Sequence, residues 1–274
     1  MKRILVPTDF SPESANAANY AASLAHAFGA TLHLINVVKL PVMMDDSILA
    51  SVMVTQAEII DESKRLMENE KDRLGTNYLV TVTGQVEEGY PPETVIQIAE
   101  ERCSDLIVMG MKGKGKSNSL FGSTTTTVIR KSLHPELVIP LKAAYKPIQH
   151  ITLASDFDSD IPTKRYKVLR TILEKFKVDL NVINVQRKLV SMDQDKVVGK
   201  MRTSVAFARS NPNFHVITDR NVEEGIQKFI QKTPTDILAM VAYHHPFLER
   251  LFGNVHTRTM SYLTEIPLMV LQGK

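Results

Sequence analysis

The chain has 274 residues, a length that suggests one large domain or two of ordinary size, either able to bury a real core. A hydrophobic content of 43% with 23% charged residues is typical of a soluble globular protein, and no apolar run approaches the ~18 residues of a membrane helix. The net charge of +3 gives little support for nucleic-acid binding, while the single cysteine, Cys103, excludes internal disulfides and fits a cytoplasmic protein.

Short β-rich runs alternate with helical stretches through the first 140 residues. The strands expected there are 3–8, 31–37, 78–84, 105–110 and 136–140. The first helix has clear boundaries, because Ser11 can cap it, Pro12 suits its first turn and Gly29 suits the position after its end. A second helix is expected within 55–75, where the charges alternate. The alternation of strands and helices predicts a doubly wound parallel sheet flanked by helices, with its ligand at the carboxyl ends of the strands. If strands 3–8 and 105–110 are neighbours, the loops after Asp9 and Gly110 share one crevice.

The sequence blocks of the first half return in the same order in the second half. "KRILVPTDFS" near the N-terminus returns as "QHITLASDFD" at 149–158, and "ATLHLINVV" at 30–38 returns as "VDLNVINVQ" at 178–186. "DLIVMGMKGKGKSNSLFGSTTTT" at 105–127 aligns without a gap with "DILAMVAYHHPFLERLFGNVHTR" at 236–258. Repetition of whole blocks in order indicates a duplicated domain.

We therefore predict two tandem domains, 1–143 and 147–274, each a five-stranded parallel sheet. The final strands, 136–140 and 267–271, are expected to meet across a pseudo-twofold axis, where they can pair antiparallel. Dissimilar halves, or a single continuous central sheet, would contradict the duplication.

Residues 110–117, "GMKGKGKS", match the Walker A pattern of Gly, four residues and Gly-Lys-Ser. A Walker A loop works because its Lys and Ser open a helix whose N-terminus holds the phosphates. Here Lys116 and Ser117 are followed by "NSLFG", a poor helix start, and Ser123 is a better one. The P-loop interpretation therefore stands as the alternative. Under it Lys116→Ala abolishes nucleotide binding or turnover.

A longer glycine loop explains the same residues: Gly110-x-x-Gly113, eight residues, and then Gly122-Ser123 at a helix N-terminus. Gly110 and Gly113 let the backbone approach a ligand closely, and Gly122-Ser123 can offer amides and a hydroxyl to phosphate. The lysines at 112, 114 and 116 add a positive rim. A connection with no ligand would also show glycines and lysines here.

This arrangement resembles the ATP-binding subgroup of the universal stress protein family. The resemblance extends to "ILVPTDFS", "INVV" and "DLIVMG", and to a short strand at the end of each half, so the chain is similar to a tandem member of that family. The usual family pattern has nine residues between the second glycine and the Gly-Ser/Thr pair, one more than here.

The resemblance implies an ATP site in the first half. The residues that it implies for the adenosine side are Pro7, Thr8, Asp9 and Val37, the last through its main chain. Those that it implies for the ribose and phosphates are Met109, Gly110, Lys112, Gly113, Gly122, Ser123, Thr124 and Thr125. A divalent ion such as Mg²⁺ is expected with the phosphates, because a triphosphate carries more charge than these lysines neutralise.

The second half lacks the features that would hold phosphate. In place of the glycines at 110 and 113 it has Val241 and His244, and the pair at 122–123 becomes Gly253-Asn254, although Asp156 remains. We expect this half to keep the fold without a nucleotide. His244, His245 and His256 form a histidine cluster, for which surface histidines are favoured over a metal site.

The expected function is that of a cytoplasmic stress-response protein that binds ATP once per chain and acts through protein partners, as an internal pseudo-dimer or a further homodimer. The sequence carries no catalytic motif, and Asp9 alone more often orients a ligand or ion than acts as a base. Two alternatives remain: a slow ATP hydrolase or P-loop-like NTPase, and a structural stress protein without a small ligand.

Overall fold

The computed structural model of the chain describes residues 1–39, 49–111, 121–157, 162–186, 194–242 and 265–272. The first half contains β1 (Arg3–Pro7), α1 (Pro12–Phe28), β2 (Thr31–Lys39), α2 (Leu49–Tyr78), β3 (Val82–Gly89), α3 (Pro91–Glu101), β4 (Leu106–Met111), α4 (Ser123–Lys131) and β5 (Glu136–Pro140). The second contains β6 (His150–Ala154), η2 (Thr163–Tyr166), α5 (Lys167–Phe176), β7 (Asp179–Gln186), α6 (Gln194–Ala206), η3 (Ala208–Ser210), β8 (Asn213–Thr218), α7 (Val222–Lys232), β9 (Ile237–Ala242) and β10 (Leu268–Gln272).

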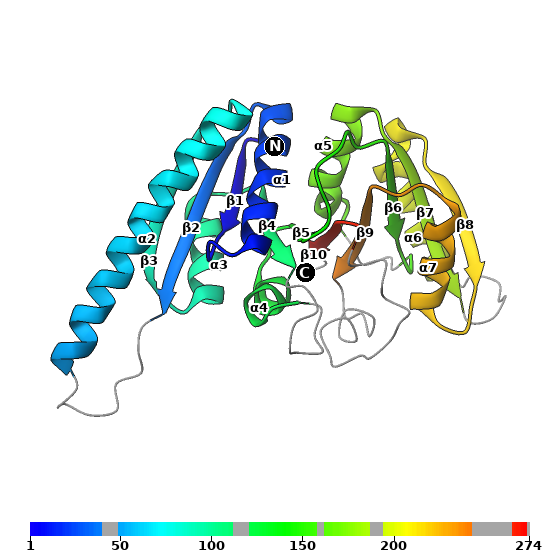
Figure 1. Cartoon of the computed structure of the whole chain (residues 1–274). Coiled ribbons are helices and arrows are strands. Elements are labelled where there is room, and N and C mark those ends of the chain that lie inside the picture. Colours follow the sequence, from blue (N-terminus) through cyan, green and yellow to red (C-terminus); the bar gives the residue numbers. More distant parts are fainter. Residues whose placement is uncertain (40–48, 112–120, 158–161, 187–193, 243–264, 273–274) are drawn as a thin grey trace.

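The described strands form one ten-stranded sheet in the order β3-β2-β1-β4-β5-β10-β9-β6-β7-β8 (Figure 1). All neighbours within each set of five are parallel, and the sets join through the antiparallel pair β5–β10, where Leu137 lies opposite Met269. The two doubly wound halves are confirmed. The expectation that a continuous sheet would contradict duplication is wrong, because the continuity arises where the two equivalent edge strands pair.

Equivalent contacts recur in both halves. Asn36 and Asn184 each donate a side-chain hydrogen bond of 2.8 Å to the backbone carbonyl of the residue that follows the first strand of their half. Phe10 and Phe157, two residues further on, both have a φ of 60°. Non-glycine residues rarely adopt this conformation, so its recurrence indicates that one turn geometry has been kept twice.

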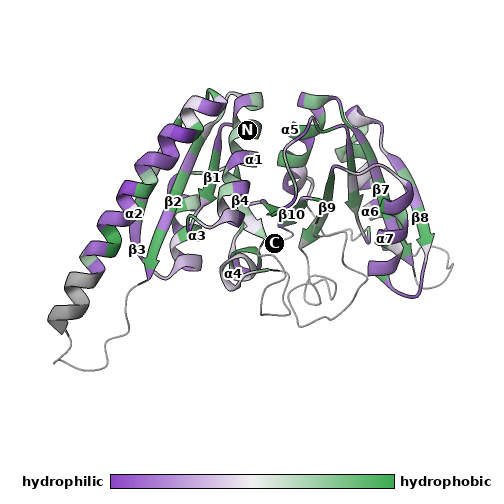
Figure 2. Cartoon of the chain, viewed as in Figure 1, coloured by the Kyte–Doolittle hydropathy of each residue, from purple (hydrophilic) through white to green (hydrophobic). Residues whose placement is uncertain are grey.

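Helices cover both faces of the sheet. One hydrophobic cluster packs α1, α2 and α5 on one face, while two clusters pack α3, α4 and α7 on the other. Figure 2 shows hydrophobic strands between helices with hydrophilic outer surfaces. No helix in the described part of the chain is both long and apolar enough to span a membrane.

Helix α1 has the predicted boundaries. The Ser11 hydroxyl accepts a hydrogen bond from the Ser14 amide at 3.3 Å, Pro12 is the first helical residue, and Gly29 adopts the left-handed conformation with a φ of 61°. Five of its seven alanines are buried, which lets the helix lie close to the sheet.

The predicted third strand at 78–84 is wrong. The apolar run there belongs partly to the end of α2, since Tyr78 is its last residue and Leu79 is 80% exposed with a φ of 52°. The strand itself, Val82–Gly89, lies at the edge of the sheet and is only half buried, so its sequence carries no continuous apolar run. Helix α2 also extends well beyond the predicted 55–75 at its N-terminal end.

A buried polar pair lies at the junction of the halves. The Glu136 side chain is 0% exposed, and one of its oxygens accepts a hydrogen bond of 2.7 Å from the Gln272 amide group. Burial raises the pKa of the Glu136 carboxyl well above its ordinary value, and the hydrogen bond from Gln272 offsets only part of that rise.

Candidate functional site

A cleft of about 550 Å³ lies at the carboxyl ends of the first-half strands. It is formed by the ends of β1, β2 and β4 and by the first turns of α1, α3 and α4. Strands β1 and β4 are neighbours from which the chain runs in opposite directions across the sheet, and ligands of doubly wound folds bind at such a switch point. The described lining residues are Pro7, Thr8, Asp9, Ser11, Glu13, Ser14, Ile35, Val37, Lys39, Pro91, Val95, Met109, Gly110, Gly122, Ser123, Thr124 and Thr125.

The predicted site residues that the structure describes all line this one cleft. They are Pro7, Thr8, Asp9, Val37, Met109, Gly110, Gly122, Ser123, Thr124 and Thr125. Asp9 and Gly110 line the same cleft, as expected, whereas the loop that follows Gly110 lies largely outside the described residues and its predicted place in the crevice stays a prediction. Lys112 and Gly113 lie outside the described residues, as do the lysines at 114 and 116.

Asp9 is held in place by serine donors. The Ser11 hydroxyl donates to Asp9 Oδ1 at 2.5 Å, and the Ser11 amide donates to the same oxygen at 3.1 Å. Burial acts to raise the pKa of Asp9, but the hydrogen bonds from Ser11 and Ser14 outweigh it and hold that pKa below its ordinary value. The cleft therefore carries a fixed negative charge at neutral pH.

Close approach of α1 explains the glycine at 110. A Cβ on Gly110 would lie 2.6 Å from the carbonyl oxygen of Glu13 and 2.7 Å from its carbonyl carbon. Such contacts are too short for any side chain, so Gly110 lets the first turn of α1 cover the end of β4. Thr125 Oγ1 donates to the carbonyl oxygen of Gly110 at 3.4 Å and links β4 to α4.

Helix α4 presents its N-terminus to the cleft. It begins at Ser123, and Gly122 precedes it in an extended conformation with no side-chain cap. The first intrahelical bond runs from the Thr126 amide to the Gly122 carbonyl, so the amides of 123–125 have no partner within the helix. The first turn contains no acidic residue, and no atom of the described residues lies within 4 Å of a Cβ placed on Gly122. This helix start agrees with the longer glycine loop, because a Walker A loop would open its helix at Lys116-Ser117.

Sequence reasoning missed part of the lining. The missed residues are Ser11, Glu13, Ser14, Ile35, Lys39, Pro91 and Val95. The first three belong to the cap that follows Asp9, and the carboxyl-end rule could have found them. Pro91 and Val95 begin the helix after β3, which the misplaced third strand concealed.

The donor groups near Asp9 decide which metals the cleft could take. Asp9 offers one carboxylate beside the hydroxyl groups of Ser11 and Ser14, and the described residues contain no group of three or more His, Cys, Asp or Glu that could hold a metal. One carboxylate among hard oxygen donors is too few to bind a metal ion by protein ligands alone, but it suits Mg²⁺ that is already bound to phosphates. His244, His245 and His256 lie outside the described residues.

Known proteins resemble this chain in both sequence and fold. The model of the universal stress protein family matches residues 1–140. Two universal stress proteins of Methanocaldococcus jannaschii are each 30% identical to this chain. The first match covers 50% of this chain and 81% of the relative, and the second covers 52% of this chain and 96% of the relative. A universal stress protein structure from Archaeoglobus fulgidus superposes with a TM-score of 0.72 at 16% identity, over 99% of this chain and 98% of its own. Because the family model covers more than half of the 274 residues, the chain belongs to the universal stress protein family.

Proposed function

We propose that this universal stress protein binds ATP in the first-half cleft and acts as a cytoplasmic stress-response regulator through protein partners. The observation that carries the proposal is the convergence on one cleft of an uncapped helix N-terminus, a glycine against α1 and an ionised aspartate. The volume of about 550 Å³ lies within the range of small-molecule sites.

The two sides of the cleft differ in chemistry. Val37, Val95 and Met109 provide apolar surface at the ends of β2, α3 and β4, which suits the flat base of a nucleotide. Ser123, Thr124 and Thr125 bring amides, hydroxyl groups and the positive end of the α4 dipole, which suit phosphate oxygens. The base therefore lies over the sheet ends in this proposal, and the phosphates lie against α4.

A divalent cation completes the charge balance. The phosphates and the ionised Asp9 carboxylate are both negative, and Lys39 is the cationic side chain in the described lining. Mg²⁺ bound to the phosphates lets Asp9 act as a ligand or an orienting group where it would otherwise repel them.

We propose one nucleotide per chain and domain boundaries at 1–143 and 147–274. Val241 occupies the position of Gly110 in the second half, so an apolar side chain stands there where the first half has only a glycine against the backbone of α1. The residues aligned with the first turn of α1, 159–161, lie outside the described residues. The second domain serves the pseudo-dimer, in which β5 and β10 pair, and both domains offer surfaces to partners or to a second copy.

The test is the small-molecule content of the purified protein. Mass spectrometry of molecules released by denaturation should find ATP, and a phosphate-release assay should show no steady turnover. Steady phosphate release that is lost in Lys116→Ala would support the slow hydrolase. Failure to retain or rebind any nucleotide would support the structural protein without a ligand.

A further inference from the structure

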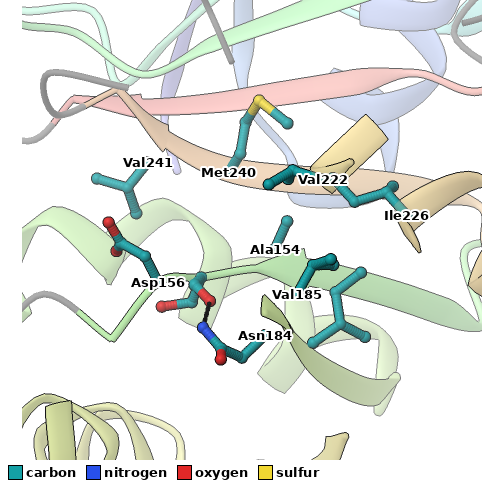
Figure 3. A pocket seen from close by; sticks show the side chains of 10 residues that line it. Ala154, Asp156, Asn184, Val185, Val222, Ile226, Met240 and Val241 are labelled. Carbon is teal, nitrogen blue, oxygen red and sulfur yellow. Dashed lines mark hydrogen bonds between the residues drawn. The ribbon is translucent and has the colours of Figure 1, made fainter. Parts of the chain in front are cut away.

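A second cavity, of about 140 Å³, lies in the second half at the carboxyl ends of β6, β7 and β9 (Figure 3). Its described lining is Ala154, Ser155, Asp156, Ile183, Asn184, Val185, Val222, Ile226, Met240 and Val241. Several of these residues keep part of their surface exposed, including Ala154, Asp156 and Val222. The lining is therefore partly open to solvent.

The cavity is a remnant of the base side of the first-half cleft. Each lining residue aligns with a residue of the first half. At the strand ends, Ala154, Ser155 and Asp156 align with Pro7, Thr8 and Asp9; Ile183, Asn184 and Val185 align with Ile35, Asn36 and Val37; and Met240 and Val241 align with Met109 and Gly110. On the helix, Val222 and Ile226 align with Pro91 and Val95. The second half thus retains walls from three strand ends and one helix. Where the first half has a glycine at the end of β4, this half has an apolar side chain.

Helix α7 packs closely against the Val185 side chain of β7 and narrows the cavity. A Cβ on Gly225 would lie 2.6 Å from Cγ1 of Val185, whereas the aligned residue of α3 is Thr94. Glycine at this position lets α7 bring Val222 and Ile226 over the end of β7 (Figure 3). The narrow shape is therefore a product of the sequence of this half.

The chemistry of the lining selects against charge. Seven of the ten lining residues are apolar, and Figure 3 shows Met240, Val222 and Ile226 on one side of the pocket and Ala154 and Val185 on the other. Asn184 already donates to the Ser155 carbonyl at 2.8 Å, and its own oxygen accepts from Gln186 at 2.9 Å. An ionised ligand would lose its hydration against apolar walls, and an anion would also face Asp156.

We propose that this pocket binds a small, uncharged, ring-sized apolar molecule, independently of the nucleotide in the first half. Its size is close to that of apolar protein cavities of about 150 Å³ that bind benzene. A packing gap that takes no ligand is the outcome that would overturn the proposal.

The experiment follows Met240 by NMR in the full chain with ¹³C-labelled methionine methyl groups, the signal being assigned with Met240→Leu. Benzene should shift this signal saturably, with a dissociation constant on the order of 1 mM, an affinity well below the ceiling for a six-atom ligand. Benzoate, a ring of the same size with a negative charge, should bind at least tenfold more weakly. Separately, MgATP should shift Met109 and leave Met240 in place, so the ATP proposal passes or fails independently of this one.

Two filling variants locate the site. Ala154→Leu and Val222→Phe place extra atoms in the cavity, and each should weaken benzene binding at least tenfold while circular dichroism remains that of the parent. Ala208→Leu, on the exposed η3, is the matched control and should bind as the parent does. Absence of a saturable benzene shift in the parent, or equal shifts with benzoate, overturns the proposal, as does benzene binding that survives in either folded filling variant.

Discussion

Gly110→Ala tests the role of close helix approach in building the cleft. The new Cβ would lie 2.6 Å from the Glu13 carbonyl oxygen and 3.1 Å from the Ser14 amide nitrogen, both backbone atoms that cannot rotate away. The first turn of α1 must therefore move, and forced shifts of this kind cost about 1–3 kcal/mol of unfolding free energy. Loss of unfolded-state freedom by the glycine offsets about 0.4–1 kcal/mol of that cost. Movement of this turn also displaces Ser11 and Ser14, which hold Asp9 in the cleft.

Urea unfolding and ATP calorimetry together measure both consequences. A net loss of about 1–2 kcal/mol lowers the urea midpoint by roughly 0.5 M, for a slope of about 2–3 kcal/mol per molar. ATP affinity should fall at least tenfold. The matched control is Gly122→Ala. Gly122 has a φ of −67° and, among the described residues, no atom within 4 Å of an added Cβ, so the urea midpoint of this variant should stay near that of the parent. A Gly110→Ala protein with the parent midpoint and the parent ATP affinity would refute the reasoning.

Three further substitutions test charge in the cleft and at the junction. The pKa of Asp9 is lowered, so its ionised form adds stability that is lost as the pH falls through and below 3.8. In thermal melts Asp9→Asn should not show this loss of stability at acid pH, and it should weaken Mg²⁺-dependent ATP binding. The pKa of Glu136 is raised, so the protein loses stability as the pH rises from 4.5 towards the pKa of the folded state. Glu136→Gln should therefore melt at a higher temperature than the parent at pH 8 but not at pH 4, and equal pH profiles of the two proteins would contradict this. Lys116→Ala should keep its ATP affinity within about tenfold, or 1.4 kcal/mol, whereas abolished binding would restore the P-loop interpretation.

Local signals made most elements of the first half predictable from the sequence. Ser11, Pro12 and Gly29 specify the limits of α1 by capping chemistry, and the buried strands β1, β4 and β5 carry continuous apolar runs. The edge strand β3 carries no such run, because one of its sides has no neighbouring strand and its residues are half exposed. The apolar residues beside it, from Tyr78 onwards, were therefore assigned to the wrong element.

The site was predictable to the extent that topology determines it. The carboxyl ends of adjacent parallel strands meet at one edge of the sheet, so Asp9, Val37 and Met109 could be grouped before the structure was known. The contact between Gly110 and the backbone of Glu13 depends on the exact approach of α1, which no local pattern specifies. The second-half pocket is not predictable from the sequence for a related reason, because the missing glycines indicate only the loss of a phosphate site, whereas the apolar walls depend on how α7 approaches β7.

Calorimetric titration of the nucleotide-free full chain with MgATP counts the nucleotide sites. We expect one site per chain, and we expect Gly110→Ala to weaken it. Two equivalent sites per chain, or no measurable binding, would contradict this expectation.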